Sequence, residues 1–345
     1  MSTRSRQKTA ARSSLGTLQV APSRGLDGGS EPQEVTRPVD AADDRIRASV
    51  ATAVGATIAT VAFRGLAARL PETTRATWER TNHAGRRVTL LEGPVWVAAA
   101  ATGLALGSGL TRRASGRAGG RASGGLGPSL LVVLASGALG ALDDLAESGS
   151  SKGLKGHLGA LRRGVLTTGA VKVVGLAATG MTGALLAHHT ARSERLQGRG
   201  RVATHGRSPE RGALAAVVGG AVIAGAANVA NLFDLRPGRA LKVVVLCGGP
   251  LALAGSRPAA AALGASAGVL RADLAGTSML GDTGANAAGA LIGLALVEGT
   301  GLRGRAVALA GLTALTLASE KVSFSKVIEA RGALRRLDEW GRSGS

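Results

Sequence analysis

Nine apolar runs alternate with charged segments along most of the chain. They cover Ala48–Leu70, Gly93–Leu110, Leu126–Leu142, Val165–Ala187, Ala213–Leu232, Val243–Gly255, Ala259–Leu270, Thr283–Gly299 and Ala306–Ser319. A helix that crosses the hydrocarbon core of a bilayer needs about 17–25 mostly apolar residues. The first five runs meet or approach this length. The pattern predicts an all-α protein, a polytopic bundle of about nine transmembrane helices over residues 45–320.

The last four runs are short for complete spans. Lys or Arg side chains at their ends would have to reach the membrane surface for each run to cross. The same runs also fit half-helices or re-entrant segments, which are tolerated where the backbone is buried in protein. The number of helices after the sixth is therefore open by one or two.

The two ends of the chain lack this pattern. Residues 1–44 are polar, rich in Ser, Arg, Gly and Pro, and without apolar periodicity, so we expect a disordered tail. Residues 321–345 form a separate C-terminal segment, and the stretch Glu320–Trp340 is typical of an amphipathic helix at the membrane surface. We interpret the Gly-rich stretch Arg117–Gly127 as a flexible linker, since no strand precedes it.

Composition favours a membrane bundle over a soluble enzyme. The chain has 53 glycines and only 2% aromatic residues, and small residues let membrane helices approach closely. A net charge of +20 would suggest nucleic acid in a soluble chain, but no aromatic platform or recognised motif accompanies it, so we expect no nucleic-acid partner. The single Cys247, which we expect to pack in its apolar run, excludes an internal disulfide. The five His form no zinc-binding pattern.

The basic residues suggest an orientation. Counting Lys and Arg without the N-terminal tail favours a cytoplasmic position for the loop Arg80–Arg87. The segment His188–Arg211, with six Arg, would then lie outside and runs against the rule. We expect a multi-pass protein of the cytoplasmic (inner) membrane, with its active face toward the cytoplasm.

Acidic residues end or flank the predicted helices on that same face: Asp143, Asp144, Asp234, Asp273 and Asp282. One interpretation is that they are solvated loop acids. Against it, a carboxylate at a helix C-terminus meets the negative end of the dipole. A charge that faces lipid near the membrane core also costs about 2.5–3.5 kcal/mol. The acids therefore predict a compensating cation, and Mg²⁺ takes carboxylates together with phosphate oxygens.

Three basic residues have two interpretations each. Lys172, inside the fourth run, either reaches to the surface or is a buried cation that binds phosphate or pairs with an Asp. Arg86 and Arg87 belong either to an ordinary positive-inside loop or to an anion-binding loop at the mouth of a site.

Several short motifs, in order, resemble those of a known family. They are Gly-Ala-Leu-Asp143-Asp144-Leu, a lysine at Lys172, Asn228-Val-Ala-Asn231-Leu-Phe-Asp234 and Gly281-Asp282-Thr-Gly284, with a looser likeness at the loop Asn82–Gly93. Together they cover most of residues 48–320. They resemble the polyprenyl-phosphate N-acetylhexosamine-1-phosphate transferases, which include the lipid I-forming translocase and the enzymes that start O-antigen and teichoic-acid linkage.

The resemblance implies an Mg²⁺-dependent transferase with a site at the cytoplasmic face. Such enzymes move a sugar-1-phosphate from a UDP-sugar to polyprenyl phosphate and release UMP, here for cell-envelope (cell-wall) glycan synthesis. The implied catalytic residues are Asp143, Asp144 and Asp234, and the implied metal ligand is Asp282. The expected substrate-binding residues are Asn228, Asn231, Lys172, Arg236, Arg86 and Arg87. Expected partners are polyprenyl phosphate, the UDP-sugar, membrane lipid and either a second copy or envelope-synthesis proteins.

The chain departs from the family pattern at several places. Pro237 stands where the family has a second Asp linked to nucleotide recognition, and Arg236 and Arg239 are candidates to compensate. Ala285 replaces a serine, and no His-rich loop or tenth helix follows. A catalytically degenerate relative that binds lipid or acts as a scaffold is therefore the alternative. A transporter would suit the Gly-interrupted helices, but the acids lie at one face and no inverted repeat is found.

Overall fold

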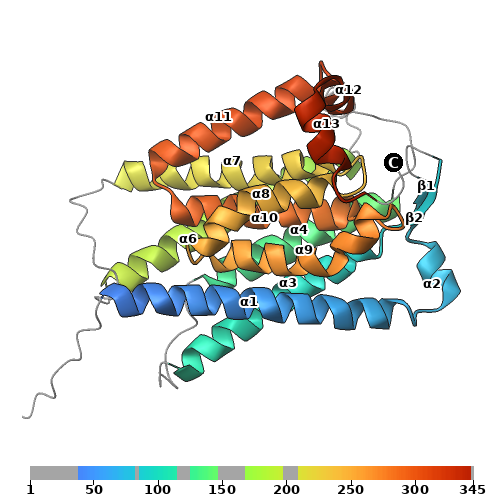
Figure 1. Cartoon of the computed structure of the whole chain (residues 1–345). Coiled ribbons are helices and arrows are strands. Elements are labelled where there is room, and N and C mark those ends of the chain that lie inside the picture. Colours follow the sequence, from blue (N-terminus) through green and yellow to red (C-terminus); the bar gives the residue numbers. More distant parts are fainter. Residues whose placement is uncertain (1–37, 82–84, 115–124, 147–167, 197–208, 343–345) are drawn as a thin grey trace, which may run out of the picture. The chain divides into compact units, whose positions relative to one another are not determined.

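The computed structural model describes residues 38–81, 85–114, 125–146, 168–196 and 209–342. Within these ranges the chain is all-helical with twelve helices, apart from one small hairpin, so the predicted class is confirmed. The long helices are α1 (Pro38–Ala67), α3 (Glu92–Ala114), α4 (Leu126–Ala146), α6 (Thr168–Leu196), α7 (Pro209–Phe233), α8 (Arg239–Leu253), α9 (Arg257–Leu274), α10 (Gly281–Gly299) and α11 (Leu302–Ser319). The shorter elements are α2 (Glu72–Ala76), α12 (Phe324–Ala330), α13 (Gly332–Glu339), β1 (Glu79–Thr81) and β2 (Arg87–Thr89). Each long helix contains most of one apolar run (Figure 1).

Five of these helices, α1, α3, α4, α6 and α7, are long and apolar enough to cross a membrane. The number rises to six if α11 and α12, which meet at a bend of 94°, form one broken span. Helix length and hydropathy thus indicate a multi-pass membrane protein. The remaining long helices are shorter or less apolar, as the pattern of the last runs predicted.

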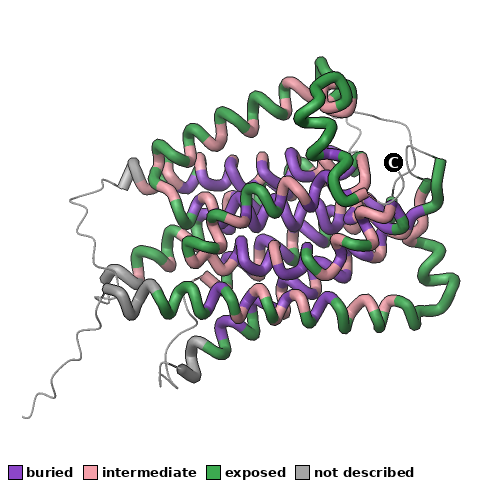
Figure 2. Tube along the Cα trace, viewed as in Figure 1, coloured by how far each residue is buried: buried purple, intermediate pink, exposed green. Residues whose placement is uncertain are grey.

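Helix α10 forms the centre of the bundle. It packs against α7, α4, α3, α9 and α8, and most of its residues are buried (Figure 2). Close packing depends on small residues, because a Cβ on Gly289 would lie 2.2 Å from the carbonyl oxygen of Ala226 on α7. In contrast, α11 contacts α7 and has no buried residue. The prediction that small residues fill the interior is confirmed.

The loop after α2 is folded as a hairpin, which the apolar pattern did not predict. Strands β1 and β2 pair antiparallel, with Arg80 opposite Val88. The hairpin is joined to the segment before α10, since Thr89 accepts a hydrogen bond from the Met279 N–H (3.0 Å) and donates to Thr277 (3.3 Å). This end of the bundle also holds α2 and α13 (Figure 1).

Several predicted boundaries differ from the structure. Helix α1 begins at Pro38, so residues 38–44 of the predicted tail are helical, and residues 1–37 lie outside the described residues. Helix α6 continues to Leu196, so part of the predicted loop 188–211 is helical, whereas residues 197–208 are outside the described ranges. Most of the predicted Gly-rich linker, 117–124, is also outside them.

Two further expectations were wrong. Cys247 is exposed on α8 instead of packed in the interior. The C-terminal stretch is not one amphipathic helix, because the backbone is extended at Arg331 (φ −114°, ψ 111°) and separates α12 from α13. An extended residue cannot continue the helical hydrogen-bond ladder.

Candidate functional site

Four acidic side chains and one lysine, far apart in sequence, meet at the first turn of α10. Asp143 and Asp144 lie in the last turn of α4, and Lys172 lies in the first two turns of α6. Asp234 directly follows α7, and Asp282 is the second residue of α10. We call these five residues the acid cluster; their contacts are described below.

Asp144 caps α10. Its Oδ1 accepts from the Asp282 N–H (3.0 Å), and its Oδ2 accepts from the Thr283 N–H (2.9 Å) and the Thr283 hydroxyl (2.6 Å). Asp144 is only 7% exposed. The first N–H groups of a helix have no partner within the helix, and the dipole favours a negative charge there. The Asp144 charge is therefore compensated by another helix and not by its own.

Asp234 contacts the same helix start. It accepts a hydrogen bond from the Gly281 N–H, while its Oδ2 has no hydrogen-bond partner among the described residues. Burial raises the pKa of the Asp234 carboxyl well above its usual value, and the neighbouring Asp273 carboxylate raises it further. Since Asp144 and Asp234 occupy the N–H groups of residues 281–283, these groups are not free to bind a substrate anion.

Lys172 joins the two remaining carboxylates. Its Nζ lies 3.3 Å from Asp143 Oδ2 and also hydrogen-bonds Asp282 Oδ2. The three side chains are 11%, 22% and 23% exposed, in the order Lys172, Asp143, Asp282. Of the two interpretations of Lys172, the structure favours pairing with Asp over reaching to the surface. One ammonium for two carboxylates leaves this part of the site negative.

Two glycines of the motifs permit this arrangement. A Cβ on Gly140 of α4 would lie 2.2 Å from the Asp282 carbonyl oxygen, so α4 reaches α10 only without a side chain there. Gly281 has φ +60°, in the left-handed region that disfavours other residues, and a Cβ there would lie 2.9 Å from Asp144 Oδ2. The Gly-Asp-Thr-Gly motif is thus a turn that presents its N–H groups to Asp144.

The three Arg of the predicted basic loop, Arg80–Arg87, contact different parts of the protein. Arg80, which was not among the candidates, donates to the backbone carbonyl of Asp144 and so places a cation at the C-terminus of α4. The Arg86 guanidinium lies over Gly276, beside Pro237. Arg87 pairs with Glu79 across the hairpin and its side chain is 79% exposed.

The other predicted substrate-binding residues have partners elsewhere. Asn228 donates to the Thr316 hydroxyl of α11 at 3.3 Å. Arg236 pairs with Glu329 of α12 at 2.7 Å. Asn231 is half-buried, and its backbone carbonyl accepts from the Asp234 N–H (3.0 Å). The structure therefore brings together the Asp and Lys residues, and directs Asn228 and Arg236 to the C-terminal elements.

Three polar residues near the site were not among the candidates. Thr283 binds Asp144, and its signal was its place inside the Gly-Asp-Thr-Gly motif. Asp273 accepts from the Gly238 N–H at 3.0 Å, and it had stood out only as an acid that flanks the eighth run. Asn286, one turn after Asp282, is fully buried and has no side-chain hydrogen-bond partner in the described part of the chain.

The acid cluster offers two carboxylates to a cation, but it forms no complete metal site among the described residues. Within the described ranges, no three His, Cys, Asp or Glu side chains are placed to hold a metal ion. However, Asp143 and Asp282 converge on one ammonium group. Mg²⁺ binds through one or two carboxylates and takes its other ligands from water and phosphate. Asp143 and Asp282 are the residues that would hold it.

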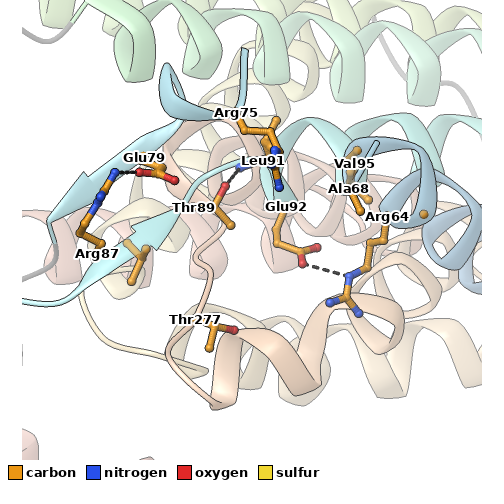
Figure 3. A pocket seen from close by; sticks show the side chains of 13 residues that line it. Arg64, Ala68, Arg75, Glu79, Arg87, Thr89, Leu91, Glu92, Val95 and Thr277 are labelled. Atoms are coloured by element: carbon orange, nitrogen blue, oxygen red, sulfur yellow. Dashed lines mark hydrogen bonds and ion pairs between the residues drawn. The ribbon is translucent and has the colours of Figure 1, made fainter. Parts of the chain in front are cut away.

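A cavity of about 570 Å³ lies between the end of α1, α2, the hairpin and the start of α3 (Figure 3). Its charged lining comprises Arg64, Arg75, Arg87, Glu79 and Glu92. The Arg64 Nε lies 3.0 Å from Glu92 Oε1, whereas Glu92 Oε2 is buried without a hydrogen-bond partner in the described residues.

Neither a protein-family model nor a curated protein matches this sequence.

Proposed function

We propose that the protein transfers a sugar-1-phosphate from a UDP-sugar to polyprenyl phosphate at the cytoplasmic membrane face, and releases UMP, in cell-envelope glycan synthesis. The observation that carries this proposal is the meeting of the motif residues around one helix start. Asp143, Asp144, Lys172, Asp234 and Asp282 come from four different helices or their ends, yet they share hydrogen bonds or ion pairs with α10.

The reaction joins two anions. An oxygen of polyprenyl phosphate attacks the phosphorus that carries the sugar, the bond from this phosphorus to the bridging oxygen breaks, and the electron pair leaves with UMP. Bound Mg²⁺ supplies charge neutralisation and polarises the phosphoryl oxygens. Lys172 adds a fixed positive charge next to Asp143 and Asp282. These three side chains are mostly buried but partly exposed, and the exposed part is accessible to substrate.

The acids have different tasks in this proposal. Asp143 and Asp282 would hold the metal, and Asp143 would accept the proton of a monoprotonated lipid phosphate as it attacks. Asp144 orients the first turn of α10, which carries Asp282. Asp234 accepts from the Gly281 N–H and so helps to hold the start of α10 where the donor diphosphate would bind.

We also propose that all nine long helices of the described residues cross the membrane, with the α10 N-terminus at the cytoplasmic side. Helix α10 packs against six other helices, so most of its surface contacts protein instead of lipid. A buried helix needs small residues for close packing more than it needs large apolar ones. The exposed face of α11 is then available to membrane lipid or to a second copy of the chain.

A catalytically degenerate, lipid-binding or scaffolding protein is the second candidate. Three features favour it: Pro237 replaces the family's second Asp, Arg236 is engaged by Glu329, and Lys172 lies between the carboxylates that would hold the metal. Such a protein would bind polyprenyl phosphate without releasing UMP.

One assay separates these candidates. Purified protein in detergent receives polyprenyl phosphate, Mg²⁺ and a panel of UDP-sugars, and UMP release is measured. We expect Asp282→Asn to lower the rate on the order of 10²–10³-fold, because it removes a charge that holds the metal at the reacting phosphate. The matched control is Asp43→Asn, an exposed acid at the start of α1, which should leave the rate unchanged. Binding of polyprenyl phosphate without UMP release from any donor would instead support the second candidate.

A further inference from the structure

The C-terminal segment folds back onto the turn that follows Asp234. We call residues 324–342, which comprise α12 and α13, the C-terminal strap, and residues 234–238 the α7–α8 turn. In Figure 1 the strap, in dark red, lies at the same end of the bundle as the hairpin. Its contacts involve a buried ion cluster, direct hydrogen bonds to the turn and an aromatic pair.

The ion cluster is centred on Asp338. Its Oδ1 lies 2.8 Å from Arg239 Nε, its Oδ2 lies 3.0 Å from Arg239 Nη2, and the same Oδ2 lies 2.9 Å from Arg342 Nη2. The Arg239 and Asp338 side chains are 4% and 9% exposed. Burial alone would raise the pKa of Asp338, but the hydrogen bonds and charges of Arg239 and Arg342 outweigh it and lower the pKa. Removing one partner of such a pair leaves an uncompensated buried charge.

The strap also holds the α7–α8 turn directly. Arg342 Nε donates to the carbonyl oxygen of Pro237 at 3.0 Å. Lys242 Nζ, one turn into α8, donates to the carbonyl oxygen of Leu337 at 3.0 Å. Where α7 ends, Phe233 stacks on Phe324 with ring centres 5.3 Å apart. The strap thus contacts the turn itself and the two helices that it joins.

The α7–α8 turn is joined by hydrogen bonds to the start of α10, where the acid cluster lies. It begins with Asp234, which binds the Gly281 N–H at the start of α10. It ends with Gly238 (φ 74°), whose N–H donates to Asp273 at 3.0 Å. A continuous set of contacts therefore runs from Asp338 through the turn to the first residue of α10.

We propose that the C-terminal strap positions the catalytic site without touching the substrate. Asp338 holds the α7–α8 turn so that Asp234 faces the start of α10. The catalytic consequence rests on the proposed transferase function, while the positioning itself does not. At Pro237, where the backbone has no N–H to donate, Arg342 binds the carbonyl and fixes the turn from outside.

Hydrogen–deuterium exchange on the full-length protein in detergent tests the positioning. The variant is Asp338→Asn, which keeps the side-chain shape but removes its charge. The matched control is Glu339→Gln, at the adjacent exposed acid. In Asp338→Asn we expect amide exchange on the order of tenfold faster in residues 234–242 and in residues 277–283. Exchange in residues 126–142 of α4 should stay as in the wild type, and Glu339→Gln should match the wild type throughout.

Two results would overturn the proposal. Faster exchange confined to residues 324–342 would mean that the strap does not hold the site, and equal acceleration in α4 would mean general destabilisation. If Asp338→Asn does not fold, Arg342→Gln provides the second variant, since it keeps the Arg239–Asp338 pair. We expect it to accelerate exchange in residues 234–238 by about threefold.

Kinetics give the second measurement. With the turn loosened, KM for the UDP-sugar should rise about tenfold in Asp338→Asn, while KM for polyprenyl phosphate changes less than about twofold. Unchanged constants for both substrates, together with faster exchange at residues 277–283, would contradict a role in the site. If the wild type releases no UMP from any donor, the proposed function fails, and the exchange measurement alone decides the positioning.

Discussion

Two ion clusters lie at the same end of the bundle and differ in charge balance. The acid cluster contains four carboxylates and one ammonium, and Asp144 and Asp234 accept hydrogen bonds from backbone N–H groups of α10 and, at Asp144, from the Thr283 hydroxyl. The Asp338 cluster contains one carboxylate and two guanidinium groups. Backbone dipoles stabilise a carboxylate without neutralising it. The acid cluster therefore keeps a negative potential that attracts cations. The Asp338 cluster has no excess negative charge and serves to hold the strap in place.

The largest effect is expected from breaking the cap on α10. Asp144→Ala removes the acceptor of two N–H groups and one hydroxyl at a buried position. Lost capping and unsatisfied donors should lower the free energy of unfolding by about 3 kcal/mol and abolish UMP release. Denaturant unfolding in detergent, followed by circular dichroism, measures this. Asp143→Ala is the control, since it should stop UMP release with a stability change below about 1 kcal/mol. Wild-type stability in Asp144→Ala would refute the capping role.

A smaller effect on stability is expected from the close backbone contact between α4 and α10, which brings the acid cluster together without involving a charge. In Gly140→Ala the new Cβ would lie 2.2 Å from the Asp282 carbonyl oxygen, so α4 and α10 must move apart. We expect a loss of about 1–3 kcal/mol in unfolding free energy and slower UMP release. Gly127→Ala, on the same helix with open space around its Cβ, should cost nothing. Equal behaviour of the two variants would show that the close approach is not needed.

The smallest effect is expected at the exposed edge of the strap. Arg236 pairs with Glu329, and the two side chains are 43% and 51% exposed. Exposed ion pairs contribute about 0–1 kcal/mol to the free energy of unfolding. Arg236→Ala should therefore change strap exchange and UMP release by less than about threefold. A more than tenfold rise in KM for the UDP-sugar would show instead that Arg236 leaves Glu329 to bind the donor, as the sequence had suggested.

Much of the site was predictable from the sequence because charged residues are rare in apolar helices. Asp143, Asp144, Asp234 and Asp282 stood out because each carries a charge at the end of an apolar run, and helix parity assigned them to one face. Their separate tasks were not predictable. Asp144 is a cap because Thr283 and the left-handed Gly281 face it, and such partners come from a helix more than a hundred residues away.

The sequence alone determined the all-α class, the positions of the long helices and the face on which the acids gather, because hydrophobic periodicity and the cost of charge in an apolar environment act locally. Only the tertiary structure decided that Lys172 pairs with Asp143 and Asp282 and that the C-terminal strap closes on Arg239. Ion pairs and capping bonds depend on the distance between atoms, and helix packing sets that distance. No pattern within a single segment encodes it.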